Sequence, residues 1–459
     1  MATKESTLDK KAVLKEFEGW LRKKYKDIKI VHLYIGKQIN GLKDTLVVVI
    51  DNVDVIEEKT FDYCGKMFDL CFKLWMRPSS ECMRICKFEN EHWHKIKDVK
   101  LAEIEQSLKM CSTSLFDEHS NLEIVSASAY RSKKNGENII FEPCIVLYCS
   151  CKGVVPYKEK EFPKQIMGRN TDVREGFFYL FPNDRYFKRA SDVLDPLMIG
   201  ASIGRKDENK EGTLGGFVTL NNGEVGIITC GHVLYDFSTN VSPQTTAVEV
   251  VQPSYGYRNT NNVCGVHIKS ILEIHQGVTV DASLAKLTDR VPQRGLFAEL
   301  MTNDLLGVGF SLENLPEYAS GSTRDYRKEN TKRTNLCIKF GARSGLTKGF
   351  LCVNGMTARC RDEQMYLTNP ASGSTCLYRS QLEFGGIATK PFAVEGDSGA
   401  LVFQVDPKSS EEEDDKLFCI GMVVGGTSYC TTVVTPIESI LESLNVKMHV
   451  FPEESMEQL

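Results

Sequence analysis

The sequence predicts a mixed fold, in which an α+β region over residues 1–190 precedes an all-β region over residues 191–459. Helical periodicity and β-rich runs alternate in the first region. After about residue 190 the chain changes to short β-rich runs and many glycines, a pattern typical of a β-barrel or β-sandwich. A chain of 459 residues also exceeds the usual size of one domain, roughly 100–200 residues, so we expect at least two domains.

The composition limits the class of protein. Hydrophobic residues make up 42% of the chain and charged residues 25%, which excludes wholesale disorder and a fibrous repeat. The formal net charge of −5 argues against nucleic acid as the main partner. The N-terminus is charged, and no stretch approaches the roughly 20 apolar residues of a membrane span. We therefore expect a cytoplasmic protein without a membrane partner, whose 16 cysteines are reduced thiols.

Residues 9–25 predict the first helix. Val13, Phe17, Trp20 and Leu21 recur on one helical face, and the remaining positions are mostly charged. The helix is therefore expected to be amphipathic, with this apolar face buried.

Two hairpins are predicted in the first region, each after a helical stretch. Asn40-Gly41 lies between two β-rich runs, and Asn-Gly favours a tight hairpin because both residues tolerate positive φ. A second helical stretch, residues 101–110, precedes β-rich runs that flank Asn135-Gly136. The similar spacing suggests that the region contains a duplicated helix-hairpin unit.

Cys82, Cys86, His92 and His94 lie between these two units, where they raise the question of a zinc site. Their spacing matches no common structural zinc pattern well. Cysteine and histidine side chains packed on a helix are the simpler interpretation, so we predict neither a metal nor a cofactor.

The stretch EGDSGALVF, residues 395–403, contains the candidate nucleophile. A serine hydroxyl attacks a carbonyl efficiently only when a base removes its proton and N–H donors stabilise the oxyanion that forms. Ser398 is the candidate nucleophile, and the N–H groups of Gly396 and Ser398 are the candidate oxyanion donors. Gly399 would let the chain leave the turn without a Cβ clash.

A base and an orienting acid are needed to support this hypothesis. His232 follows the apolar run EVGIIT, so it is expected at the point where a strand ends and a turn begins. Asp281, in GVTVDASLAKL, begins an alternating run in which a buried carboxylate could orient the imidazole. Asp236 is the rival acid, although its position four residues after His232 favours a role in the turn. A hydrogen-bonded structural role for His232 is the other interpretation.

The motifs TCGHVL, VDASLAKL and EGDSGALVF, in this order, resemble the His, Asp and Ser motifs of the chymotrypsin/trypsin-like serine proteases. KFGARSGLTKGF, IGMVVGGTS and VVTPIESILESL resemble further strands and the C-terminal helix of this family. The resemblance covers about residues 195–450. It implies a double β-barrel of two six-stranded antiparallel barrels, with a Ser398–His232–Asp281 triad in the cleft between them.

The sequence differs from the secreted members of this family at positions that concern disulfides and activation. Val233 follows His232 where secreted members carry a disulfide-forming cysteine, so the resemblance leans toward intracellular, HtrA-like proteins. In secreted members the residue at Asp397 pairs with a new N-terminus, and no convincing activation site precedes it here. Counting back six positions from Ser398 gives Phe392 at the base of the substrate pocket, with Gly425 and Gly426 in its walls. This implies a preference for apolar side chains.

Two functions from different classes remain after this reasoning. The first is an intracellular serine endopeptidase that acts on proteins or peptides. The second is a catalytically silent trypsin-like fold that serves as a binding or signalling module, since fold does not dictate activity. Residues 162–178 resemble a module that precedes the protease unit in some trypsin-like proteins, which suggests a regulatory partner for the N-terminal region. A connecting strand and turn is the alternative.

Overall fold

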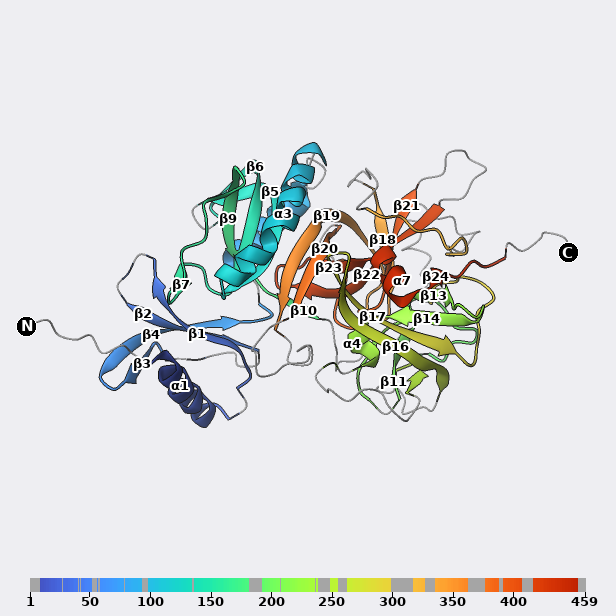
Figure 1. Cartoon of the computed structure of the whole chain (residues 1–459), viewed down its shortest axis with the longest axis horizontal. Coiled ribbons are helices and arrows are strands. Elements are labelled where there is room, and N and C mark those ends of the chain that lie inside the picture. The colour runs from blue at the N-terminus through green and yellow to red at the C-terminus, as the bar shows by residue number, and fades with distance from the viewer. Residues whose placement is uncertain are drawn as a thin grey trace, which may run out of the picture.

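The computed structural model is mostly β, with few helices (Figure 1). It describes residues 9–452 except 27, 40, 42, 52–55, 57, 78, 93–97, 134–135, 181–191, 207, 236, 238–247, 255–261, 299–316, 327–334, 362–375, 388–390 and 407–415. Within this part of the chain, no helix is long and apolar enough to cross a membrane.

The first unit is a five-stranded sheet covered by one helix, at the left of Figure 1. Asp9 caps the helix by accepting from the N–H groups of Lys11 and Ala12. The predicted apolar face buries Val13, Phe17 and Leu21 against the sheet, whose strand order is β3-β4-β2-β1-β7. The elements are α1 (Lys10–Lys24), β1 (Ile30–Gln38), β2 (Asp44–Ile50), β3 (Thr60–Tyr63), β4 (Lys66–Leu74) and β7 (Val154–Pro156).

The second unit repeats the strand pairing of the first. In the first unit β1 and β2 form an antiparallel pair, and β4, from the β3–β4 hairpin, pairs parallel with β2. In the second unit β5 and β6 pair antiparallel, and β9, from the β8–β9 hairpin, pairs parallel with β6. Asn40 and Asn135, from the predicted hairpin turns, lie outside the described residues. The elements are α2 (Ser80–His92), α3 (Asp98–Glu118), β5 (Leu122–Lys133), β6 (Asn138–Cys149), β8 (Gln165–Ile166) and β9 (Arg169–Glu175).

The first β-rich part of the following region is an eight-stranded sheet of order β12-β11-β15-β16-β17-β14-β13-β24. Its pairings form an open path among the described residues, which differs from the closed six-stranded barrel that the family resemblance implied. The strands are β11 (Ser202–Arg205), β12 (Gly212–Thr213), β13 (Gly216–Thr219), β14 (Val225–Thr229), β15 (Glu249–Val251), β16 (Val263–His275), β17 (Val278–Leu287) and β24 (Lys447–Met448).

The remaining strands form an eleven-stranded sheet that continues into the second unit. Pairing of β18 with β19 closes a ring through β18, β21, β22, β23, β20 and β19. β19 also pairs with β5, so the sheet crosses the domain boundary expected near residue 190. Helix α7 (Ile437–Leu444) follows β23. The strands are β10 (Phe178–Leu180), β18 (Cys337–Gly341), β19 (Gly345–Cys360), β20 (Cys376–Gly386), β21 (Leu401–Asp406), β22 (Lys416–Thr427) and β23 (Thr432–Pro436).

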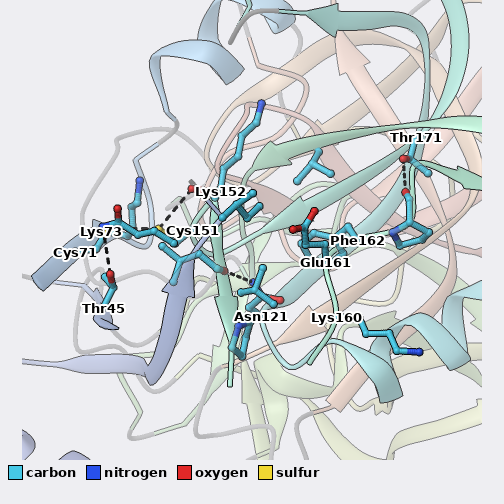
Figure 2. A pocket seen from close by; sticks show the side chains of 18 of the residues that line it. Thr45, Cys71, Lys73, Asn121, Cys151, Lys152, Lys160, Glu161, Phe162 and Thr171 are labelled. Atoms are coloured by element: carbon cyan, nitrogen blue, oxygen red, sulfur yellow. Dashed lines mark hydrogen bonds between the residues drawn. The ribbon is translucent and has the colours of Figure 1, made fainter. Parts of the chain in front are cut away.

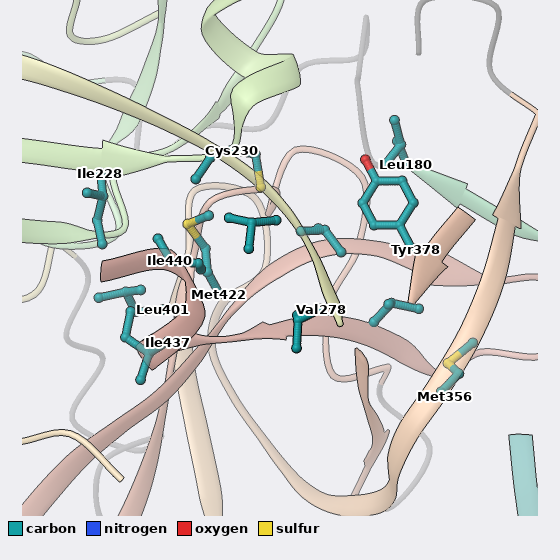
Figure 3. Packing of buried hydrophobic residues seen from close by; sticks show 14 of the residues in the cluster. Leu180, Ile228, Cys230, Val278, Met356, Tyr378, Leu401, Met422, Ile437 and Ile440 are labelled. Atoms are coloured by element: carbon teal, nitrogen blue, oxygen red, sulfur yellow. The ribbon is translucent and has the colours of Figure 1, made fainter. Parts of the chain in front are cut away.

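One apolar cluster joins both sheets and fixes the ends of the strands that carry the site. It includes Ile228 of β14 and Cys230 just after that strand, together with Leu401 and Met422 from the second sheet, as Figure 3 shows. Because such a close-packed interior resists small displacements, the loops at these strand ends are held in fixed relative positions.

Candidate active site

His232 lies where strand β14 ends. It belongs to the short helix α4 (Gly231–Leu234) and is 7% exposed. Gly231 is required here, since a Cβ at this position would lie 2.5 Å from Oδ1 of Asp281. The N–H group of His232 donates to the same oxygen at 3.1 Å, so the carboxylate holds the backbone that carries the imidazole.

Asp281 holds the ring of His232 as well as its backbone. The two side chains meet with Nδ1 of His232 2.5 Å from Oδ2 of Asp281, which lies in β17 and is fully buried. The hydroxyl of Tyr378 donates to Oδ2 at 2.8 Å. Burial, together with the charge of Asp281, raises the pKa of Tyr378, so its phenol stays neutral and acts as a donor. A buried carboxylate with these donors can fix one tautomer of the imidazole.

Ser398 completes the arrangement from the other sheet. Its Oγ lies 2.9 Å from Nε2 of His232 and 3.2 Å from the carbonyl oxygen of Val424, and the residue is fully buried. With the Nδ1 proton donated to Asp281, Nε2 has a lone pair that can accept the hydroxyl proton. The three residues that the sequence singled out are thus brought together in one line of hydrogen bonds, from a serine to a histidine to a carboxylate.

The turn before Ser398 is held by Asp397, in a way that the sequence analysis did not foresee. Nζ of Lys339 lies 2.9 Å from Oδ2 of Asp397, and both side chains are fully buried. The same carboxylate accepts from Oγ of Ser344 at 2.6 Å and from the N–H groups of Arg343, Ser344 and Val394. Burial lowers the pKa of Lys339, and the charge of Asp397 opposes this shift. The sequence feature that could have predicted this pair is a lysine within the otherwise apolar strand β18.

Gly396 and Gly399 give this turn its shape. Their φ angles are 93° and 95°, a region that favours glycine. A Cβ on Gly396 would lie 2.3 Å from Cγ of Arg343, and one on Gly399 would lie 2.2 Å from Oγ1 of Thr229. Among the described residues, the N–H groups of Gly396 and Ser398 donate to no protein acceptor. These groups are therefore available to an oxyanion.

The three residues expected around the substrate pocket lie in different surroundings. Phe392 is fully buried, its ring stacks on that of Phe384 at 5.4 Å, and its carbonyl oxygen accepts from Thr347. Gly425 and Gly426 lie on β22, directly after Val424, and both pair with residues of β10. The structure thus brings the two glycines next to Ser398, whereas Phe392 packs inside an apolar cluster.

The alternatives considered from the sequence have different outcomes. Asp236 and His94 lie outside the described residues. Cys86 donates from its thiol to the carbonyl oxygen of Tyr429, and Nδ1 of His92 lies 2.8 Å from the carbonyl oxygen of Phe88, so these two side chains have protein partners.

Cys230, His232 and Asp281 are a second possible donor set, with ligand atoms within 4.8 Å of one another. Burial, followed by the charge of Asp281, raises the pKa of Cys230, and its thiol donates to the carbonyl oxygen of Val423 at 3.0 Å. Metal ligation requires a thiolate. The donor set therefore fits hydrogen bonding better than it fits a metal ion.

A cavity of about 810 Å³ lies apart from these residues, along the edges of the two N-terminal units. Figure 2 shows Cys71 and Cys151 in its wall, with their sulfur atoms 3.3 Å apart. The hydrogen bond from Cys151 and the charge of Lys73 outweigh burial and lower the pKa of Cys71 to about 7. The cavity contains none of the residues that the sequence analysis proposed for chemistry.

Comparisons with known proteins give structural similarities only. No protein-family model and no curated protein matches the chain. Among solved structures, a Nocardiopsis protease covers 55% of this chain and 98% of its own, at 15% identity and a TM-score of 0.31. Protease A of Thermobifida fusca covers 55% of this chain and 98% of its own, at 14% identity and a TM-score of 0.32. A chymotrypsin of Cellulomonas bogoriensis covers 56% of this chain and 98% of its own, at 15% identity and a TM-score of 0.31. The function is therefore inferred from the geometry of the site.

Proposed function

We propose that the chain is a serine endopeptidase with a trypsin-like fold. The observation that carries the proposal is the line of hydrogen bonds from Ser398 through His232 to Asp281, at 2.9 and 2.5 Å. A binding module has no need of these three residue types at these distances, whereas acyl transfer needs all of them. The ring of six paired strands that carries Ser398 supports the barrel part of the proposed fold.

The proposed reaction begins when His232 takes the hydroxyl proton at Nε2 while Oγ of Ser398 attacks the carbonyl carbon of a peptide bond. The C–O bond forms as the carbonyl becomes an oxyanion, which the N–H groups of Gly396 and Ser398 stabilise. Asp281 stabilises the imidazolium. His232 then donates its proton to the departing amine, and the C–N bond breaks. Water, activated by the same histidine, hydrolyses the acyl-enzyme.

The setting proposed for this enzyme is intracellular and reducing. All 16 cysteines are thiols rather than disulfides in the structure, and chains with many reduced cysteines are typical of reducing compartments. Gly425 and Gly426 follow Val424 and carry no side chains that would narrow a substrate pocket, so we propose protein or peptide substrates with an apolar side chain at the cleaved bond. The N-terminal region is proposed to bind a regulatory partner.

The test is covalent labelling of the full chain with a fluorophosphonate, which reacts with an activated serine. Wild-type protein is compared with Ser398→Ala and with Ser114→Ala, a control at an exposed serine of α3. We expect labelling of wild type and Ser114→Ala, and a loss on the order of 10⁴-fold or more in Ser398→Ala. Folded wild-type protein that stays unlabelled under every condition would favour the binding module instead.

A further inference from the structure

A short strand of the N-terminal half is added to the edge of β22, next to Ser398. Strand β10 pairs antiparallel with β22 through Phe178 and Thr427, Tyr179 and Gly426, and Leu180 and Gly425. The pairing continues into a reciprocal contact just before β10. The N–H group of Phe177 donates to Oγ of Ser428 at 3.0 Å, and the N–H group of Ser428 donates to the carbonyl oxygen of Phe177 at 2.8 Å.

This edge of β22 leads directly to the nucleophile. Oγ of Ser398 lies 3.2 Å from the carbonyl oxygen of Val424, and Gly425 is the next residue. Leu180 is paired with Gly425, so the described part of β10 extends to within one residue of the position opposite Val424. A peptide that runs antiparallel along β22 to reach Ser398 must therefore use the edge that β10 occupies.

The fit between the two strands is close. A Cβ on Gly425 would lie 2.4 Å from the carbonyl oxygen of Tyr179, 2.9 Å from Cε2 of Phe178 and 3.1 Å from Cα of Leu180. Glycine at this position allows a backbone to approach that a side chain would exclude. The edge is thus shaped for an extended chain lying directly against it.

Side chains of β10 also pack on residues that hold the site. Phe178 is 1% exposed, and its ring centroid lies 5.1 Å from that of Tyr378, whose hydroxyl donates to Asp281. Leu180 is 4% exposed, and Figure 3 shows it beside Tyr378. With β10 bound, Ser398 is fully buried.

We propose that β10 is a resident occupant of the edge of β22 at Gly425–Thr427 and that it holds the site closed against peptide substrates. The inference rests on the proposed function. Extended polypeptide segments with apolar side chains at alternate positions are the ligands that this edge fits, because backbone pairing gives affinity and alternate side chains give selectivity. A substrate gains access to Ser398 only when β10 leaves the edge, so the full chain reacts at a rate set by the fraction of molecules in which the edge is open.

The experiment combines two measurements on full-length protein. The first is the rate of fluorophosphonate labelling. The second, which does not depend on activity, is hydrogen exchange of the amide of Ser428, whose N–H group donates to the carbonyl oxygen of Phe177 just before β10. Leu180→Asp and the milder Leu180→Ala weaken β10, and Ile274→Asp is the control at a 58% exposed apolar residue of β16. Each variant is also made with Ser398→Ala.

We expect faster exchange at the edge and labelling faster by roughly tenfold or more in Leu180→Asp, because the rate scales with the open fraction. Leu180→Ala gives a smaller increase in the same direction, and it carries the test where Leu180→Asp does not fold. Ile274→Asp matches wild type in both measurements.

Two results overturn the inference in different ways. Faster exchange with labelling at the wild-type rate means that β10 does not close the site, and the proposed function stands. If folded variants show faster exchange but stay unlabelled, the proposed function is rejected together with the inference. The same holds if labelling persists after Ser398→Ala.

Discussion

Lys339→Met tests whether the buried pair beneath the nucleophile turn holds that turn in place. Nζ of Lys339 and Oδ2 of Asp397 are 2.9 Å apart, which corresponds to about 6 kcal/mol of attraction at an effective dielectric constant near 20. The cost of burying the ammonium group outweighs this attraction, since the pKa of Lys339 is lowered despite the charge of Asp397. Methionine fills a similar volume but leaves the carboxylate of Asp397 buried without a cation. We therefore expect a loss of about 3–5 kcal/mol in the free energy of unfolding.

Urea denaturation followed by intrinsic fluorescence measures this loss. Lys286→Met is the matched control, because the side chains of Lys286 and Glu224 are each 42% exposed and such pairs contribute about 0–1 kcal/mol. Adding Asp397→Asn to Lys339→Met should give a double variant that is more stable than the sum of the single losses predicts, by about 2 kcal/mol. A loss below about 1 kcal/mol in Lys339→Met, with additive double substitution, would refute this reasoning.

Two further predictions concern titratable groups. Cys71, whose pKa is lowered to about 7, should be alkylated by iodoacetamide with a half-maximal rate near pH 7, because only the thiolate reacts. Lys73→Met should move this midpoint to higher pH, since it removes a charge that lowers the pKa. Peptide mass spectrometry measures the alkylation rate, and a midpoint near pH 9 in wild type would contradict the predicted thiolate. Burial raises the pKa of Glu383 above its ordinary value of 4.5, so the folded state binds more protons than the unfolded state above that pH, and stability falls as pH rises through the raised pKa. The melting temperature of Glu383→Gln minus that of wild type should therefore be larger at pH 8 than at pH 5. The same value at both pH values would count against the raised pKa.

The sequence predicted the residues of the candidate site better than their surroundings, for a physical reason. His232 and Ser398 each stand beside an apolar run, and a polar residue at a strand end is visible in the sequence itself. Lys339 lies inside an apolar run, and its partner Asp397 is far along the chain, so no local pattern joins them. Tyr378 was missed for the same reason, since its contact with Asp281 depends on how two sheets pack.

The fold shows the same division between local and long-range information. Periodicity predicted helix α1 and the apolar face that buries Val13 and Phe17. It could not predict that β19 would pair with β5 through Thr357 and Val125, because strand pairing over this distance is fixed by packing. The expected division at residue 190 followed a change in composition, whereas the sheet continues across it.

The position of β10 links the N-terminal half to the candidate active site. Only Gly176 and Phe177 separate β10 from β9, which is held in the sheet by its parallel pairing with β6. The three Cα–Cα steps from Glu175 to Phe178 span at most about 10 Å, so β10 cannot move far from β22 while β9 stays paired, unless the chain turns at Gly176. A Cβ on Gly176 would lie 2.8 Å from the ring of Tyr148 and 3.0 Å from that of Tyr429, two rings that stack at 4.2 Å. We therefore expect the proposed opening of the edge to require a rearrangement of these two tyrosines, one from each half of the chain.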